Sequence, residues 1–193
     1  VYGNATEQIH IAAQNDRFTL EDSEITGSLN SLQTGNAAVL LAGTEASIVG
    51  NQISHAYTGI FSSGHQMTVS RNLVTDINDT GIAHLAWADT GSVFEDNRVL
   101  NAFTGIHIGN GGGSNPAFVG NNSAISNRGD GFWASGNVVM TGNESRNNRQ
   151  AGIRLHGGLA ENNVVSHNQD GIVVGSFTHS AVARGNRIYG NAK

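Results

Sequence analysis

An Asn recurs along this chain with a period in the low twenties, and that repeat limits the available folds more than any other feature. In residues 94–109 an apolar residue lies three positions before Asn97, another lies two positions after it, and a Gly-Ile pair begins eight positions later. The repeating positions are Asn51, Asn72, Asn97, Asn122, Asn143, Asn163 and Asn186, with steps of 21, 25, 25, 21, 20 and 23. A repeat of this length is typical of solenoids, in which each unit packs only against its neighbours.

The repeats favour strands over helices. Each one holds short alternating apolar stretches separated by Gly and Asn, and no stretch has the 3.6-residue period of an amphipathic helix. One repeat cannot bury its apolar face alone, whereas stacking at the ~4.8 Å strand spacing gives a continuous core. The Leu-x-x-Leu-x-Leu pattern of leucine-rich repeats is missing. The sequence therefore predicts an all-β fold, a single-stranded right-handed parallel β-helix of about seven to eight coils with about three strands each.

We expect one domain over residues 1–193, with irregular first coils in 1–43 and regular coils in 44–193. Residues 8–12 and 18–26 alternate as strands do, 37–43 take the place of a Gly-Ile strand, and 27–36 form a long turn between them. The period lengthens at insertions in 87–92 and 109–116. Insertions in repeat proteins map to loops on one face, which is often the binding face.

The recurrent Asn and Gly are given structural roles. Asn tolerates a left-handed backbone at a sharp corner, and its amide can bond to the backbone and to the equivalent amide of the next coil. The Gly of each Gly-apolar pair is expected to mark a second corner with positive φ.

The Asn repeat and the Gly-Ile pairs at Gly59, Gly81, Gly105, Gly152 and Gly171 resemble a known family. It is the right-handed parallel β-helix family of carbohydrate-binding proteins and sugar hydrolases, with pectate-lyase-like enzymes, mannuronan C5-epimerases, phage tailspikes and NosD-type periplasmic proteins. The resemblance spans roughly residues 18–189. It implies the fold and a secreted, extracellular or periplasmic carbohydrate-active protein. It selects no reaction, because one fold hosts many chemistries.

Composition argues against other classes. A net charge of −5 and a pI near 5.8 do not suit a nucleic-acid partner, which would require a basic stripe. No apolar run approaches the ~20 residues of a membrane span. The chain has no Cys, so disulfides, thiolate metal sites and a Cys nucleophile are excluded.

The strand that follows each recurrent Gly should alternate inward and outward. If Val39, Ile60, Ile82, Ile106, Phe132, Ile153 and Ile172 point inward, the next residues form an outward row. That row consists of Leu40, Phe61, Ala83, His107, Trp133, Arg154 and Val173. The outward row two positions further on contains Ser63, Gly109, Ser135, His156 and Gly175, and Asp130 lies at the corner beside them.

These residues suit a sugar polymer that lies across the coils. Aromatic side chains can cover the apolar face of a pyranose ring, and Arg can bind a carboxylate with two parallel hydrogen bonds. His can transfer protons near neutral pH. The candidate catalytic residues are His107, Arg154 and Asp130, and the candidate substrate-binding residues are Phe61, Trp133 and His156. In the structural alternative, Trp133 and Arg154 form a cation–π pair, or the row packs on a partner.

The residues leave the reaction open. The Tyr-Gly-Phe-Asp-Pro-His motif of mannuronan epimerases is missing. Pectate lyases use several Asp for Ca²⁺ and an Arg or Lys base, for which Asp130 and Arg154 would be the candidates. A hydrolase needs two carboxylates, and Asp130 and Asp170 share a corner two coils, roughly 10 Å, apart. The eight His do not repeat as a ligand set, so no metal or cofactor is predicted, and Ca²⁺ has no supporting motif.

Two functions follow. The first is a polysaccharide-binding protein that uses the row containing Phe61, His107, Trp133 and Arg154, as a recognition protein or as a polysaccharide lyase, hydrolase or epimerase. The second is a non-catalytic module for adhesion or assembly, in which the same row is a partner interface in a homo-oligomer or an end-on association.

Overall fold

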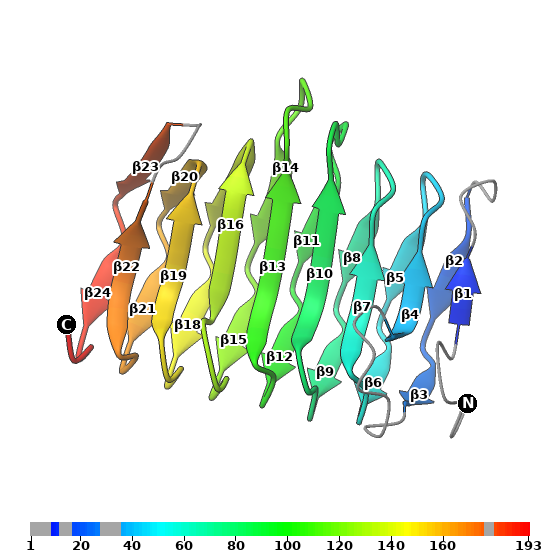
Figure 1. Cartoon of the computed structure of the whole chain (residues 1–193), viewed down its shortest axis with the longest axis horizontal. Helices are drawn as coiled ribbons and strands as arrows, with labels where there is room; N and C mark the ends of the chain where they lie inside the picture. Colours follow the sequence, from blue (N-terminus) through cyan, green and yellow to red (C-terminus); the bar gives the residue numbers. More distant parts are fainter. Residues whose placement is uncertain (1–8, 12–16, 28–35, 176–179) are drawn as a thin grey trace.

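The protein is seen in a computed structural model that describes residues 9–11, 17–27, 36–175 and 180–193. The described strands form three parallel sheets of eight strands each, and every third strand of the chain joins the same sheet (Figure 1). The first sheet contains β1 (Ile9–Ile11), β4 (Ala37–Leu41), β7 (Thr58–Ser62), β10 (Thr80–Ala86), β13 (Thr104–Asn110), β16 (Phe132–Gly136), β19 (Ala151–His156) and β22 (Asp170–Val174).

The other two sheets are built from shorter strands. The second sheet contains β2 (Thr19–Glu21), β5 (Ser47–Val49), β8 (Thr68–Ser70), β11 (Val93–Glu95), β14 (Ala117–Gly120), β17 (Val138–Thr141), β20 (Gly158–Glu161) and β23 (Ala181–Arg184). The third contains β3 (Glu24–Thr26), β6 (Gln52–Ser54), β9 (Leu73–Thr75), β12 (Arg98–Leu100), β15 (Ser123–Ile125), β18 (Glu144–Arg146), β21 (Val164–Ser166) and β24 (Arg187–Tyr189). The predicted right-handed parallel β-helix is confirmed.

The core is a stack of equivalent apolar side chains. Val39, Ile60, Ile82, Ile106, Phe132 and Ile153 pair in register along the first sheet, and each is at most 1% exposed. Ile172 continues the column and is partly buried. The predicted inward column is therefore confirmed. It fixes the outward direction of the neighbouring side chains, because side chains alternate along a strand.

The Asn ladder stacks as predicted, but its backbone conformation was predicted wrongly. Asn97 Nδ2 donates to Asn122 Oδ1 at 3.0 Å and to the carbonyl of Val69 at 2.8 Å, and this arrangement repeats along the ladder. The left-handed residue is the one before each ladder Asn. These residues are Gly50, Arg71, Asp96, Asn121, Gly142, Asn162 and Gly185. The turn is made one position earlier, which leaves the Asn side chain aimed into the coil, where it satisfies buried backbone groups.

The structure contains a second, shorter Asn ladder that the sequence analysis did not predict. Asn127, Asn148, Asn168 and Asn191 bond amide to amide at the next corner. The earlier coils carry apolar residues after the equivalent left-handed positions, namely Ala56, Ile77 and Ala102. Because Asn occupies this position only in the later coils, it does not give a repeat along the whole sequence.

The recurrent Gly does not have positive φ, so the predicted second corner at these residues is wrong. Among Gly59, Gly81, Gly105, Gly131, Gly152 and Gly171, none is a positive-φ residue. A Cβ on Gly81 would overlap the Val99 side chain and would lie 2.7 Å from the carbonyl oxygen of Gly105. Gly is required here by the close approach of the neighbouring coil.

Where residues 1–43 are described, they form four strands, β1 to β4. Within 18–26 there are two strands, because Asp22 turns the chain with a φ of 46°. The predicted turn at 27–36 lies mostly outside the described residues. β13 runs to Asn110, so the second insertion begins later than predicted, at Gly111. In Figure 1 the loops after β10 and β13 project at the top of the view. The described residues contain no helix long and apolar enough to cross a membrane.

Candidate functional site

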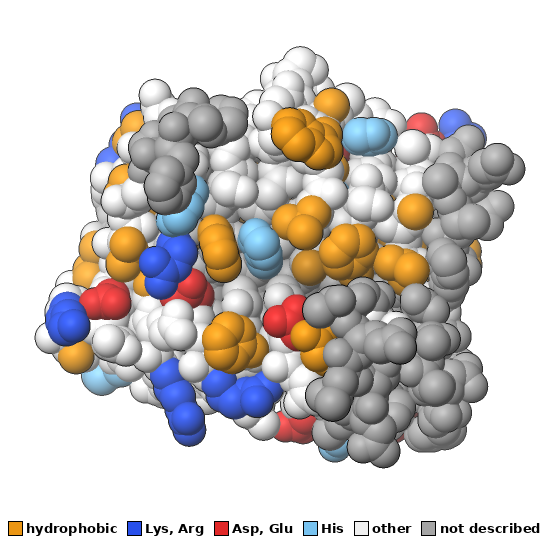
Figure 2. Space-filling model, viewed as in Figure 1, with side chains coloured by type: hydrophobic (Ala, Val, Ile, Leu, Met, Phe, Trp, Pro, Cys, Tyr) orange, Lys and Arg blue, Asp and Glu red, His pale blue; other side chains and the backbone are white. Residues whose placement is uncertain are grey.

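The predicted outward row lies in register on the first sheet. Leu40 pairs with Phe61, Phe61 with Ala83, Ala83 with His107, His107 with Trp133, Trp133 with Arg154, and Arg154 with Val173. Ala83 is 5% exposed, and the other six side chains are half-buried. Figure 2 shows these residues as a line across the middle of the face. We call this line the outward row.

Two His rings contact Trp133. The ring of His107 stacks on Trp133, with centroids 4.8 Å apart and planes inclined by 15°. His156 lies on the other side, with centroids 5.9 Å apart and planes inclined by 59°. The structure thus brings together three residues that the sequence placed on one face. The two contacts hold the indole in a fixed orientation, with His107 covering one of its faces.

Asp130 holds Arg154. Arg154 Nε donates to Asp130 Oδ2 at 2.7 Å, and Nη2 donates to Oδ1 at 3.0 Å. Oδ1 also accepts the backbone N–H of Ala151 at 2.9 Å. The side chain of Asp130 is 5% exposed and that of Arg154 is 27% exposed. These bonds to Asp130 raise the pKa of Arg154, so its guanidinium stays charged.

The electrostatics of His107 differ from those of Arg154. Burial lowers the pKa of His107 below its usual value, and the nearby negative charge of Asp130 opposes that effect only in part. A lowered pKa means a neutral imidazole at pH 7, with one ring nitrogen able to accept a proton. The row therefore offers a neutral proton acceptor and a permanent cation on either side of one indole.

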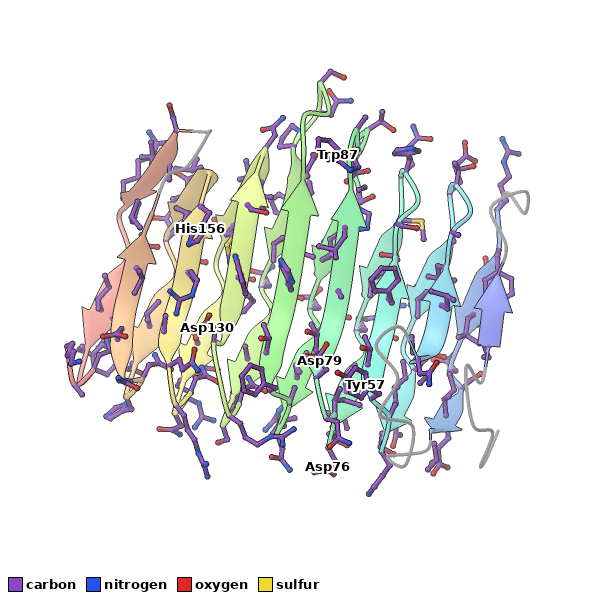
Figure 3. All side chains as sticks on the ribbon, viewed as in Figure 1. Tyr57, Asp76, Asp79, Trp87, Asp130 and His156 are labelled. Carbon is purple, nitrogen blue, oxygen red and sulfur yellow. The ribbon has the colours of Figure 1, made fainter. Side chains whose placement is uncertain are left out.

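A second line of outward side chains lies two positions further along each strand, and it contains an apolar residue that the sequence analysis did not single out. Leu85 pairs with Gly109, Gly109 with Ser135, and Ser135 with His156. Leu85 is 43% exposed, and Trp87, two residues later, is 86% exposed. Figure 3 labels Trp87 above this end of the sheet. The signal was present in the sequence, because Trp87 begins the insertion expected on the binding face.

A buried cluster of four polar side chains lies beneath this end of the sheet. His84 Nδ1 is 2.8 Å from Ser62 Oγ, and Nε2 is 3.3 Å from Asp89 Oδ2. Asp89 also accepts the hydroxyl of Ser92 at 2.7 Å and its backbone N–H at 3.0 Å. All four residues are fully buried, so no substrate can reach the Ser62 hydroxyl. We call Ser62, His84, Asp89 and Ser92 the His84 network. It ties the loop after β10 to the core.

The two carboxylates that the sequence placed at one corner, Asp130 and Asp170, do not form a free catalytic pair. Asp170 pairs with Ala151, whose N–H binds Asp130, so Asp130 and Asp170 do stand two coils apart at one corner. Asp130 is already bonded to Arg154. No group of three or more potential metal ligands occurs among the described residues.

A parallel solenoid with a sheet face of indole, imidazole and guanidinium groups belongs to the class of β-helix proteins. The chain is a member of the right-handed β-helix family, because the family model described as "Right handed beta helix region" matches residues 1–137 and 87–193. Among solved structures, an alginate lyase from Paenibacillus sp. str. FPU-7 is similar, with 15% identity and a TM-score of 0.49 over 87% of this chain and 77% of that chain. No curated protein matches the sequence.

Proposed function

We propose that this protein is secreted to an extracellular or periplasmic space and binds a polysaccharide across the outward row. The observation that carries the proposal is the stack of His107 on Trp133 beside Arg154, whose guanidinium is fixed by Asp130. A sugar ring can pack against the outer edge of the stacked His107 and Trp133 rings, and a fixed guanidinium binds a carboxylate with defined geometry. The preferred ligand is therefore an acidic polysaccharide.

Of the catalytic alternatives, the site favours proton abstraction over hydrolysis. A lyase or epimerase removes the proton next to a uronate carboxylate, and it needs a base and a group that neutralises that carboxylate. His107 fits the base and Arg154 fits the neutralising cation. In the lyase case the C–H electron pair forms a C=C bond, the glycosidic C–O bond breaks, and the proton is returned from His107 to the leaving oxygen. Asp130 acts as the positioning residue for Arg154. Hydrolysis would need a second free carboxylate.

The first experiment is a binding screen against a panel of acidic and neutral polysaccharides, with mass spectrometry of every bound polymer. Binding with unsaturated products identifies a lyase, and binding with inverted units identifies an epimerase. Binding with neither identifies a recognition protein. If no polysaccharide binds, the proposal is wrong.

Trp133→Ala should weaken binding of any polymer found in that screen by about tenfold or more, because an aromatic contact contributes about 1 kcal/mol beyond its buried area. Isothermal titration calorimetry measures the change. Phe118→Ala is the matched control, since Phe118 is a half-buried outward aromatic on β14 in the second sheet. Equal losses in both variants would show that Trp133 acts through the fold and not through the ligand.

His107→Ala should lower turnover by about 100-fold or more while changing affinity little, because general-base catalysis acts on the chemical step. Since burial lowers the pKa of His107, the wild-type rate should persist below pH 6.5, where an ordinary His becomes protonated. A pH–rate profile checks this. Full activity in both His107→Ala and Arg154→Ala would refute the catalytic assignment.

One observation favours a second function. Leu40, Phe61 and Ala83 form an apolar stretch at one end of the outward row (Figure 2). Such a stretch could pack against a partner or a second copy in an assembly or adhesion module. That alternative predicts an oligomer by light scattering, which Phe61→Ala converts to a monomer.

A further inference from the structure

A pocket of about 210 Å³ opens beside the outward row, at the base of the loop after β10. It is lined by Leu85, Ala86, Trp87, Gly109, Gly111 and Ser135. Its volume is below the ~300 Å³ of the smallest usual ligand pockets, so it suits a single ring and not a large ligand.

The pocket exists because two of its residues have no side chain. A Cβ on Gly109 would lie 3.1 Å from Leu85 Cδ2 and 3.3 Å from Ser135 Oγ. A Cβ on Gly111 would lie 3.0 Å from Trp87 Cε3. Neither Gly is among the positive-φ residues, so backbone strain does not require Gly here. The two Gly residues leave room against one face of an indole.

The position of Trp87 is supported from below. Asp89, two residues later, is bound within the buried His84 network. The backbone N–H of Gly111 donates to the carbonyl of Ala86 at 3.0 Å, and Asn110 Oδ1 accepts the N–H of Gly113 at 3.1 Å. An exposed indole on an anchored loop loses little conformational entropy when a ligand binds. Trp87 is therefore 86% exposed on a loop whose backbone is held in place by hydrogen bonds.

We propose that this pocket is a second sugar subsite, which takes the apolar face of an uncharged sugar unit of the same polymer. The inference rests on the proposed function. None of the six lining residues is charged. The indole offers a stacking face, while the Ser135 hydroxyl can bond to sugar hydroxyls. Trp87 follows β10, and Arg154 lies on β19, three coils or roughly 14 Å further along. The ligand is thus a polymer with an acidic unit at Arg154 and a neutral unit near Trp87.

The two Trp residues of the chain allow each site to be read separately. In Trp133→Phe, fluorescence reports Trp87 alone, and in Trp87→Phe it reports Trp133 alone. Each variant is titrated with glucan, mannan, galacturonan and mannuronan hexasaccharides and with two mixed acidic–neutral polymers, xanthan and gellan. The readouts are the emission maximum and protection from iodide quenching. The expected result is that a mixed polymer shifts and protects both Trp residues.

A pocket-filling variant tests the geometry. In the Trp133→Phe background, Gly109→Val should weaken the Trp87 response at least tenfold, because the valine fills the space beside Leu85 and Ser135. Gly112→Ala is the matched control, since a Cβ there meets only the carbonyl oxygen of Trp87, at 3.8 Å. Circular dichroism confirms that both variants keep their strands.

The outcomes separate this inference from the function on which it rests. A response of Trp133 without one of Trp87 overturns the subsite and leaves the proposed function standing. A response of Trp87 alone supports the subsite and overturns binding across the outward row. No response of either Trp overturns both. An unchanged Trp87 response in Gly109→Val overturns the subsite, and a response of Trp87 only to acidic homopolymers overturns its neutral specificity.

Discussion

Asn122→Ala is expected to lower the free energy of unfolding by about 3 to 5 kcal/mol, because several buried groups would lose their hydrogen-bond partners together. Asn122 is fully buried. Its Oδ1 accepts the backbone N–H and the Nδ2–H of Asn97 at 2.9 and 3.0 Å. Its Nδ2 donates to the carbonyl of Phe94 at 2.9 Å and to Asn143 Oδ1 at 3.0 Å. Water cannot replace these bonds at the centre of the solenoid.

Urea unfolding followed by circular dichroism measures this loss. Asn115→Ala is the matched control, since Asn115 is exposed and should change stability by less than about 0.5 kcal/mol. If Asn122→Ala does not fold, Asn186→Ala tests the same ladder in its last coil, where Asn186 is only partly buried and the loss should be smaller. A loss below about 1 kcal/mol in Asn122→Ala would contradict a structural role for the ladder.

Asp89→Ala is expected to lower the free energy of unfolding by about 3 kcal/mol or more at pH 7, because it leaves Ser92 buried without its acceptor and removes the carboxylate that lies 3.3 Å from His84 Nε2. Burial alone would raise the pKa of Asp89. The contact with His84, whose Nε2 lies 3.3 Å from Asp89 Oδ2, and the hydrogen bonds from Ser92 outweigh burial and lower it to about 2 from an unfolded value of 3.8. At roughly 1.4 kcal/mol per pH unit, that difference corresponds to roughly 2 kcal/mol of stability.

The direction of the pH effect follows from that difference. Between pH 4 and 2 the unfolded chain binds a proton at Asp89 more readily than the folded chain does, so the contribution is present above pH 4 and lost as the pH falls through about 2. Asp89→Asn removes this dependence. Unfolding measured at pH 7, 4 and 2.5 tests it, with Asp96→Asn as the control, because Asp96 is exposed and Asn also tolerates its φ of 55°. Parallel pH profiles for wild type and Asp89→Asn would contradict the assignment.

The His84 network connects stability to the proposed second subsite. Asp89 anchors the loop that begins at Trp87, so Asp89→Asn should also weaken the protection of Trp87 from iodide quenching by a bound polymer in the Trp133→Phe background. The same loop would then serve both the core and the ligand, as expected where binding residues lie on loops held by a rigid scaffold.

Much of the candidate site could be predicted from the sequence, because a solenoid makes register a local property. Each recurrent Gly sets where its strand begins, so neighbouring strands start in register. The alternation of inward and outward residues then places His107, Trp133 and Arg154 above one another. The stacking of the Asn amides followed from the same repeat.

Other features could not be predicted, because they depend on contacts between residues far apart in the sequence. The pairing of Arg154 with Asp130, and not with the ring of Trp133, depends on the position of a corner one coil away. The burial of His84 depends on Asp89 turning inward from a loop whose sequence, WADTGS, resembles an ordinary surface insertion. The pocket beside Trp87 depends on Gly109 and Gly111 in the following coil.

The sequence by itself determined the solenoid, its inward column and its outward row, because periodic apolar residues can be buried together only by stacking equivalent positions. Only the tertiary structure decided which residue at each corner has a left-handed backbone. It also decided that the recurrent Gly is required by the neighbouring coil, and that the charge of Arg154 is paired with Asp130. Those features arise where neighbouring coils approach within van der Waals distance. Side-chain volume and hydrogen-bond satisfaction there are shared between coils and are not set within one repeat.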